Sequence, residues 1–148
     1  MNERAGDGTE KYIFGKYALL KRLAVGGMGE IYLARQTGVM GFERLAILKA
    51  LLPDLADDPD FRNQFLDEAK IAATLNHPNI VGIYEVGMWQ DIYFLAMEYI
   101  EGESLQNILR NAAQNHLKIP HRVSAKIICD AADALHHAHT ATSIGGDF

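Results

Sequence analysis

The first third of the chain alternates apolar and polar residues with the period of two that is typical of β-strands. Two such stretches, residues 12–24 and 30–35, flank the glycine cluster Gly26-Gly27-Met28-Gly29. A third apolar run, residues 44–52, begins with Arg44 and contains one further charged residue, Lys49. The pattern predicts two strands joined by a glycine-rich turn, followed by a buried strand that carries one lysine.

The next segment has the sequence signals of a helix. Asp58 is suited to the N-cap, Pro59 to the first helical position, and Asn76-His77-Pro78 to the end of the helix. Apolar side chains recur along one face, namely Phe61, Phe65, Ala72 and Leu75. Glu68 falls on the same face, so we expect its carboxylate to point toward the core. An unpaired buried charge is costly, and Glu68 therefore needs a cationic partner.

The rest of the chain continues the mixture of strands and helices. Residues 80–86 and 92–100 predict two further strands joined by a turn. Two amphipathic helices follow, one from Ser104 and one from about Pro120. The predicted fold class is α+β.

Composition and charge narrow the function classes. Of the 148 residues, 49% are hydrophobic, which is ordinary for a globular domain. Acidic residues outnumber basic ones by 19 to 14, and the net charge of -5 argues against a nucleic acid or an anionic membrane as the main partner. We expect residues 1–11 to form a flexible polar leader rather than a signal peptide, and no segment to span a membrane.

The single cysteine, Cys129, lies in the apolar run Ile127-Ile128-Cys129 and is interpreted as a buried, inert thiol. This cysteine usage fits a reducing, cytoplasmic compartment. His136 and His139 are one helical turn apart, but no further ligand completes a zinc site, so no metal site is predicted.

The glycine cluster alone leaves two interpretations open. It is either a plain tight turn or a hairpin whose backbone amides lie against phosphate oxygens, which larger side chains would obstruct. Glycine-rich loops of dinucleotide-binding folds lead into a helix, whereas this one leads into a strand. Lys49 and Glu68 likewise form either a structural ion pair or a device that orients the lysine toward phosphates.

Five segments of the chain resemble motifs of the bacterial eukaryotic-type (Hanks-type) serine/threonine protein kinases, and they occur in the same order as in that family. They are residues 23–32 (LAVGGMGEIY), 46–49 (AILK), 65–69 (FLDEA), 75–81 (LNHPNIV) and 96–102 (AMEYIEG). They are similar to the family's glycine-rich loop, its lysine strand, its αC helix, the link that follows αC, and the gatekeeper with the hinge. The resemblance spans residues 17 to about 139.

The resemblance implies a fold and a domain organisation. Residues 12–101 would form the ATP-binding N-lobe, a five-stranded antiparallel sheet with the αC helix. Residues 102–148 would form the first two helices, αD and αE, of an incomplete helical C-lobe.

The resemblance also implies roles for single residues. Lys49 would contact the α and β phosphates and Glu68 would hold Lys49, and these two are the implied catalytic residues. The residues implied to surround the nucleotide are Leu23, Ala24, Val25, Gly26, Gly27, Met28, Gly29, Glu30, Ile31, Lys49, Met97, Glu98 and Ile100. Among them Leu23 and Ile31 would enclose the adenine, and Met97 would be the gatekeeper. The carbonyl of Glu98 and the amide of Ile100 would bind the adenine edge.

Two residues depart from the family pattern inside the matched region. Ala24 stands where the first loop glycine is usual, which narrows the backbone conformations open to the loop. Ile47 stands two residues before the lysine, where alanine is usual, and adds bulk to the roof of the adenine pocket.

The sequence contains neither an H-R-D-type catalytic loop nor a D-F-G segment. These segments supply the catalytic base and the magnesium ligands in protein kinases. We therefore expect an ATP-binding part of a protein serine/threonine kinase, truncated before the catalytic loop and inactive by itself, with Mg²⁺ needed only when a complete C-lobe is present. A non-catalytic, pseudokinase-like nucleotide-binding or interaction module is the alternative.

Overall fold

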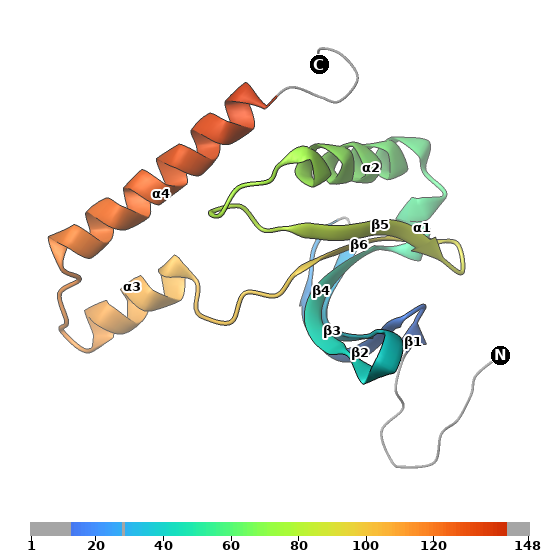
Figure 1. Ribbon diagram of the computed structural model, residues 1–148, viewed down its shortest axis with the longest axis horizontal. Coiled ribbons are helices and arrows are strands. Elements are labelled where there is room, and N and C mark those ends of the chain that lie inside the picture. Colours follow the sequence, from blue (N-terminus) through green and yellow to red (C-terminus); the bar gives the residue numbers. More distant parts are fainter. Residues whose placement is uncertain (1–12, 28, 142–148) are drawn as a thin grey trace. The chain divides into compact units, whose positions relative to one another are not determined.

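The computed structural model describes residues 13–27 and 29–141. They divide into two compact units: the first runs to Ala73 and includes Ile83–Tyr99, and the second comprises Thr74–Gly82 and the residues from Ile100 onward. The leader predicted at residues 1–11 and Met28 of the glycine loop lie outside the described residues, as do residues 142–148. Figure 1 labels the elements of both units.

The first unit is built on an antiparallel sheet that has six strands within the described residues, in the order β1-β2-β3-β4-β6-β5. The strands are β1 (Ile13–Phe14), β2 (Tyr17–Val25), β3 (Gly29–Thr37), β4 (Glu43–Leu51), β5 (Ile83–Trp89) and β6 (Ile92–Glu98). Between them lie the 3₁₀ turn η1 (Val39–Gly41) and the helices α1 (Pro53–Ala56) and α2 (Pro59–Thr74). The predicted antiparallel sheet with one long helix is confirmed.

The structure adds to the prediction at the edges of the sheet. The two-residue strand β1 pairs with the start of β2 through a turn at Gly15, whose φ of +61° suits glycine, and makes the sixth strand. At the opposite edge, β5 begins at Ile83 rather than at residue 80, because the Ile80 amide donates to the His77 carbonyl in a turn. Helix α2 matches its predicted limits, and Asp58 accepts a hydrogen bond from the Asp60 amide at 2.9 Å.

Alternation along the strands divides the core into two clusters. On one face of the sheet the buried residues are Tyr17, Ala34, Ala46, Leu48, Phe94 and Ala96. On the other face Leu51 and Leu95 pack against Phe65 and Ala69 of α2. Helix α2 lies along the sheet in Figure 1 and covers this second face. Lys49 belongs to the same strand as residues of both clusters and shares the face that α2 covers.

The sheet curls strongly, which a side-chain contact demonstrates. The hydroxyl of Tyr17 in β2 donates to the carboxylate of Glu85 in β5 at 2.9 Å, and Lys16 pairs with the same carboxylate at 2.5 Å. Strands β3, β4 and β6 separate β2 from β5 in the sheet order. The curled sheet therefore encloses the first cluster of core residues.

The second unit contains α3 (Leu105–Gln114) and α4 (His121–Thr140). The Ser104 hydroxyl accepts a hydrogen bond from the Asn107 amide at 3.2 Å, so the predicted start of the first helix is confirmed as an N-cap. No helix among the described residues combines the length and apolar character needed to cross a bilayer.

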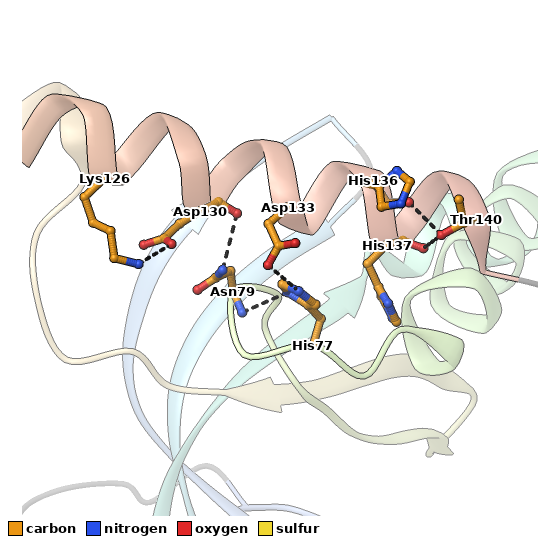
Figure 2. A network of polar contacts seen from close by, with 8 residues as sticks. All are labelled: His77, Asn79, Lys126, Asp130, Asp133, His136, His137 and Thr140. Atoms are coloured by element: carbon orange, nitrogen blue, oxygen red, sulfur yellow. Dashed lines mark hydrogen bonds and ion pairs between the residues drawn. The ribbon is translucent and has the colours of Figure 1, made fainter.

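The segment between α2 and β5 belongs to the second unit and lies on α4 (Figure 2). His77 Nε2 lies 3.1 Å from the Asp133 carboxylate, and the centres of the His77 and His137 rings lie 5.1 Å apart, with the rings tilted by 31°. The Asn79 side-chain amide donates to the Asp130 carbonyl at 3.3 Å. These contacts hold residues 77–79 against the helix.

The interpretation of Cys129 as a buried thiol was wrong. Cys129 is exposed, and no residue of α4 is buried in the described structure. The apolar run around Cys129 predicted a helix correctly, but the neighbouring Ile128 is also exposed. Burial depends on what packs over a helix, and an apolar run alone does not show this.

Candidate functional site

Lys49 lies at the centre of a row of side chains that crosses four strands. It is opposite Ile31 of β3 and Leu95 of β6, and Ile31 is opposite Ala24 of β2. Residues directly opposite one another in antiparallel strands share a face. The row therefore places Lys49 beside Ile31, on the face that α2 covers.

A second row lies next to the first on the same face. Ile47 is opposite Leu33 of β3 and Met97 of β6, and Met97 is opposite Ile83 of β5. Ile47 and Met97 are half-buried. The two predicted adenine-pocket residues Ile31 and Met97 thus flank the lysine, with the bulk of Ile47 between them and beside Lys49.

The ion pair between Lys49 and Glu68 joins the sheet to α2. Lys49 Nζ lies 2.7 Å from Glu68 Oε1 and 5.8 Å from the centre of the Phe65 ring. The lysine side chain is 21% exposed, whereas that of Glu68 is 53% exposed. The predicted cationic partner of Glu68 is therefore Lys49, but the carboxylate is half-exposed and not buried as predicted.

The glycines of the hairpin between β2 and β3 have different structural roles. The Gly26 amide donates to the Gly29 carbonyl at 2.8 Å and closes the turn. A Cβ atom added to Gly27 would meet no atom within 4 Å, whereas one added to Gly29 would lie 2.3 Å from the Ala50 carbonyl oxygen. Gly27 therefore borders open space, and Gly29 is required where β3 passes close to β4.

Ala24 fits its place without strain. It lies in β2, opposite Ile31, and is absent from the described residues with positive φ. Extended backbone is open to any amino acid, so this position of the hairpin does not require the glycine that is usual there.

Two neighbouring residues predicted to contact the nucleotide, Glu30 and Ile31, lie on opposite faces of the hairpin. Glu30 precedes Ile31 in the strand, so its side chain lies on the opposite face, where it pairs with Arg22 at 2.8 Å and accepts a hydrogen bond from the Tyr32 hydroxyl. Val25 is opposite Glu30. Arg22 and Tyr32 were not among the predicted site residues, although the alternation of β3 places Tyr32 on the same face as Glu30.

The remaining predicted residues lie at the rim. Leu23 is an extra residue in β2, because the pairing shifts between Arg22 and Ala24, and its side chain is partly exposed. Glu98 ends β6 opposite Ala46, and Ile100 belongs to the second unit.

Comparison with known proteins identifies the family. The protein kinase domain matches residues 17–145. This chain belongs to the protein kinase family. The kinase fold predicted from the sequence is confirmed, since the solved kinase domain of Mycobacterium tuberculosis PknI matches with a TM-score of 0.65 and 30% identity over 88% of this chain and 51% of the solved chain.

Curated kinases from two bacteria are also similar. The tyrosine-protein kinase MasK of Myxococcus xanthus is 44% identical over 133 residues, which are 90% of this chain and 21% of MasK. The serine/threonine-protein kinase PrkC of Bacillus subtilis is 36% identical over 129 residues, which are 87% of this chain and 19% of PrkC. The chain thus spans about a fifth of the length of these relatives and about half of a solved kinase domain.

Protein kinases use ATP and Mg²⁺ as a family. The described residues fit a nucleotide: a lysine held by a carboxylate, a glycine bordering open space, and apolar side chains on the same face. Among residues 13–27 and 29–141, no three His, Cys, Asp or Glu side chains gather as metal ligands. We therefore assign no magnesium ligand to this part of the chain.

Proposed function

We propose that this chain forms the ATP-binding part of a protein kinase that transfers the γ-phosphoryl group of ATP to a serine or threonine hydroxyl of a protein. The observation that carries the proposal is the 2.7 Å ion pair between Lys49 and Glu68 on the face that also bears Ile31 and Met97. Phosphoryl transfer depends mainly on positioning and on compensation of phosphate charge. A lysine held in one orientation provides both.

The pair is better suited to orientation than to stability. Exposed ion pairs contribute only about 0–1 kcal/mol, and the Glu68 side chain is half-exposed. Because Glu68 holds one side of the ammonium, the remaining N–H donors of Lys49 are directed to other acceptors. The α and β phosphate oxygens of ATP are acceptors of this kind.

The glycine hairpin is proposed to cover the phosphates. Gly27 borders open space, so phosphate oxygens can approach its backbone amide without meeting a side chain. Leu23, Ile31 and Met97 are proposed to enclose the adenine, with the Glu98 carbonyl and the Ile100 amide at its edge. Ile47 adds a larger side chain to this pocket than alanine would, which leaves less room for the adenine.

The 148-residue chain alone is proposed to bind ATP without transferring phosphate, because its sequence contains no H-R-D or D-F-G segment. Serine or threonine is the proposed acceptor, in line with the name of PrkC, while MasK is named as a tyrosine kinase. Phosphoamino acid analysis of the product of a longer protein, in which this chain is joined to a catalytic loop, distinguishes the two, and phosphotyrosine would contradict the proposal.

The test is calorimetric titration of the chain with Mg-ATP. Lys49→Met and Glu68→Gln should weaken binding by roughly tenfold or more, the effect of losing a charge-assisted hydrogen bond in a site. Lys70→Met and Asp67→Asn are matched controls, since these neighbours form an exposed 2.9 Å pair within α2. The proposal fails if the unmodified chain does not bind, or if the Lys70 variant loses as much affinity as the Lys49 variant.

A further inference from the structure

Three polar side chains form a cluster on the face of the glycine hairpin opposite Lys49. Arg22 of β2 lies directly across from Tyr32 of β3, and Glu30 is two residues before Tyr32 on the same strand. Arg22 Nη1 is 2.8 Å from Glu30 Oε1, and the Tyr32 hydroxyl donates to the other carboxylate oxygen. Both oxygens of Glu30 are therefore engaged by hairpin residues.

The cluster spans an irregularity in the hairpin. Arg22 is opposite Tyr32, but the next pairs are Ala24 with Ile31 and Val25 with Glu30, so Leu23 is an extra residue in β2, in addition to a register shift between Leu19 and Lys21. Such bulges bend and twist the strand that contains them. The ion pair connects Arg22, which precedes the bulge, to Glu30, which follows it in the ladder. It consequently links the hairpin tip to the residues of β2 that precede the bulge.

The β2 side of the tip has few contacts of its own. Residues 23–27 are all exposed. Beyond the bulge this side is held by two backbone pairs with β3 and by the Gly26 to Gly29 hydrogen bond, whereas the β3 side is paired with β4 as far as Gly29. Exposed hairpins with few packing contacts open easily. The Arg22–Glu30–Tyr32 cluster supplies side-chain contacts next to this exposed segment.

The cluster is anchored in the core through Tyr32. The half-buried Tyr32 ring packs against the first cluster of core residues, which includes Ala34 and Leu48. The hydrogen bond from Tyr32, with a smaller effect of Arg22 in the same direction, holds the pKa of the Glu30 carboxyl below its ordinary value. Burial and the bond to Glu30 raise the pKa of Tyr32. At neutral pH the cluster is thus a cation, a carboxylate and a neutral phenol.

We propose that Arg22, Glu30 and Tyr32 are positioning residues, which hold the glycine hairpin at the height from which its amides contact the phosphates of ATP. The inference rests on the proposed function and changes the role of Glu30, which acts from the face opposite Lys49 and does not touch the nucleotide. Loss of the cluster should loosen the hairpin while leaving Lys49 and Glu68 in place.

The first measurement compares ATP with adenosine, which lacks the phosphates. Glu30→Gln and Tyr32→Phe should weaken Mg-ATP binding by roughly three- to tenfold, the range for one hydrogen bond to a charged group, and change adenosine binding by less than about twofold. Glu43→Gln is the matched control, because Glu43 pairs with Arg35 across the next hairpin over the same sequence separation. Both glutamine variants remove one negative charge, which by itself favours binding of anionic ATP.

The second measurement is independent of nucleotide. Amide hydrogen exchange at residues 24–31 should be at least about threefold faster in Glu30→Gln and Tyr32→Phe than in Glu43→Gln. If the unmodified chain does not bind ATP, the proposed function fails and the exchange rates alone decide on the cluster. Unchanged exchange at residues 24–31, or equal ATP affinity of the Glu30 and Glu43 variants, overturns the inference.

Discussion

Gly29 and Ala50 approach each other so closely that a Cβ atom on Gly29 would lie 2.3 Å from the Ala50 carbonyl oxygen. The contact is between backbone atoms of paired strands, since Gly29 is opposite Leu51 at the end of β4. A side chain could rotate away from an added Cβ atom, but the Ala50 carbonyl belongs to the backbone of β4, which is paired with β3 and β6 and cannot shift easily. The packing of β3 against β4 therefore requires glycine at position 29, whether or not a nucleotide binds.

Gly29→Ala is expected to destabilise the first unit by about 1–3 kcal/mol, the range for forcing extra atoms into a packed site. Gly27→Ala should leave the thermal unfolding midpoint nearly unchanged, because its Cβ would meet no atom within 4 Å. The Gly27 variant should instead lose Mg-ATP affinity if phosphates occupy that space. Thermal unfolding by circular dichroism checks the first difference, and equal midpoints of the two variants would contradict it.

Tyr17 should make the fold sensitive to alkali. Burial, followed by the hydrogen bond and the negative charge of Glu85, raises the pKa of Tyr17 well above its ordinary value. The unfolded chain ionises this phenol near pH 10, whereas the folded chain does not. The contribution of Tyr17 to stability is therefore complete below about pH 10 and is lost progressively above it.

Tyr17→Phe keeps the ring that packs at 5.9 Å against Phe94 and removes only the hydroxyl. It should cost about 1–3 kcal/mol at neutral pH, the typical cost of losing a hydrogen bond to a charged group. It should also flatten the decline in stability between pH 9 and pH 11. Urea unfolding at several pH values provides the measurement, and an identical alkaline decline in the variant would refute the assignment.

The tautomer of the neutral His77 ring follows from its two neighbours. The Asn79 backbone amide donates to Nδ1 at 3.2 Å, which leaves the proton of the neutral ring on Nε2, facing Asp133. Two-bond proton–nitrogen correlation spectra of the neutral ring should show the Nε2–H form of His77. A ring protonated on Nδ1 alone would exclude the arrangement in Figure 2.

His77→Ala should destabilise the second unit by about 1–3 kcal/mol, because the side chain is only 12% exposed and its loss leaves the Asn79 amide without its acceptor. His121→Ala, at an exposed position in the first turn of α4, is the control and should cost less than about 0.5 kcal/mol. Chemical denaturation of both variants checks this, and equal losses would mean that the contacts of His77 contribute nothing.

The helices of the second unit should promote self-association of the 148-residue chain. Large apolar side chains on both helices are exposed, namely Leu105, Ile108, Leu109, Val123, Ile128 and Leu135. Exposed apolar patches of this kind mark surfaces that bind or aggregate. Light scattering coupled to size exclusion should give a mass that rises with concentration.

Ile128→Glu should reduce this association, whereas Met40→Glu should not, although Met40 in η1 is fully exposed. The comparison separates the helices of the second unit from the turn of the first. A monomer at all concentrations, or an equal effect of both substitutions, would count against the expected surface.

The sequence by itself determined the elements and the central pair of the site. Strand alternation, the caps at Asp58 and Ser104, and the glycine turn are local signals, each encoded within a few residues of the structure it specifies. Lys49 and Glu68 were predicted in the same way, from their positions on one strand and one helix. The order of five short motifs then sufficed for the family.

Only the tertiary structure decided what depends on register and on neighbouring elements. It left Glu68 half-exposed and Cys129 exposed, and it placed Glu30 with Arg22 and Tyr32 on the face of the hairpin opposite Lys49. It also joined Tyr17 to Glu85, 68 positions later in the chain. Pattern fixes which face of an element is apolar, but the bulge at Leu23, the curl of the sheet and the packing over each face arise from contacts between residues far apart in the sequence.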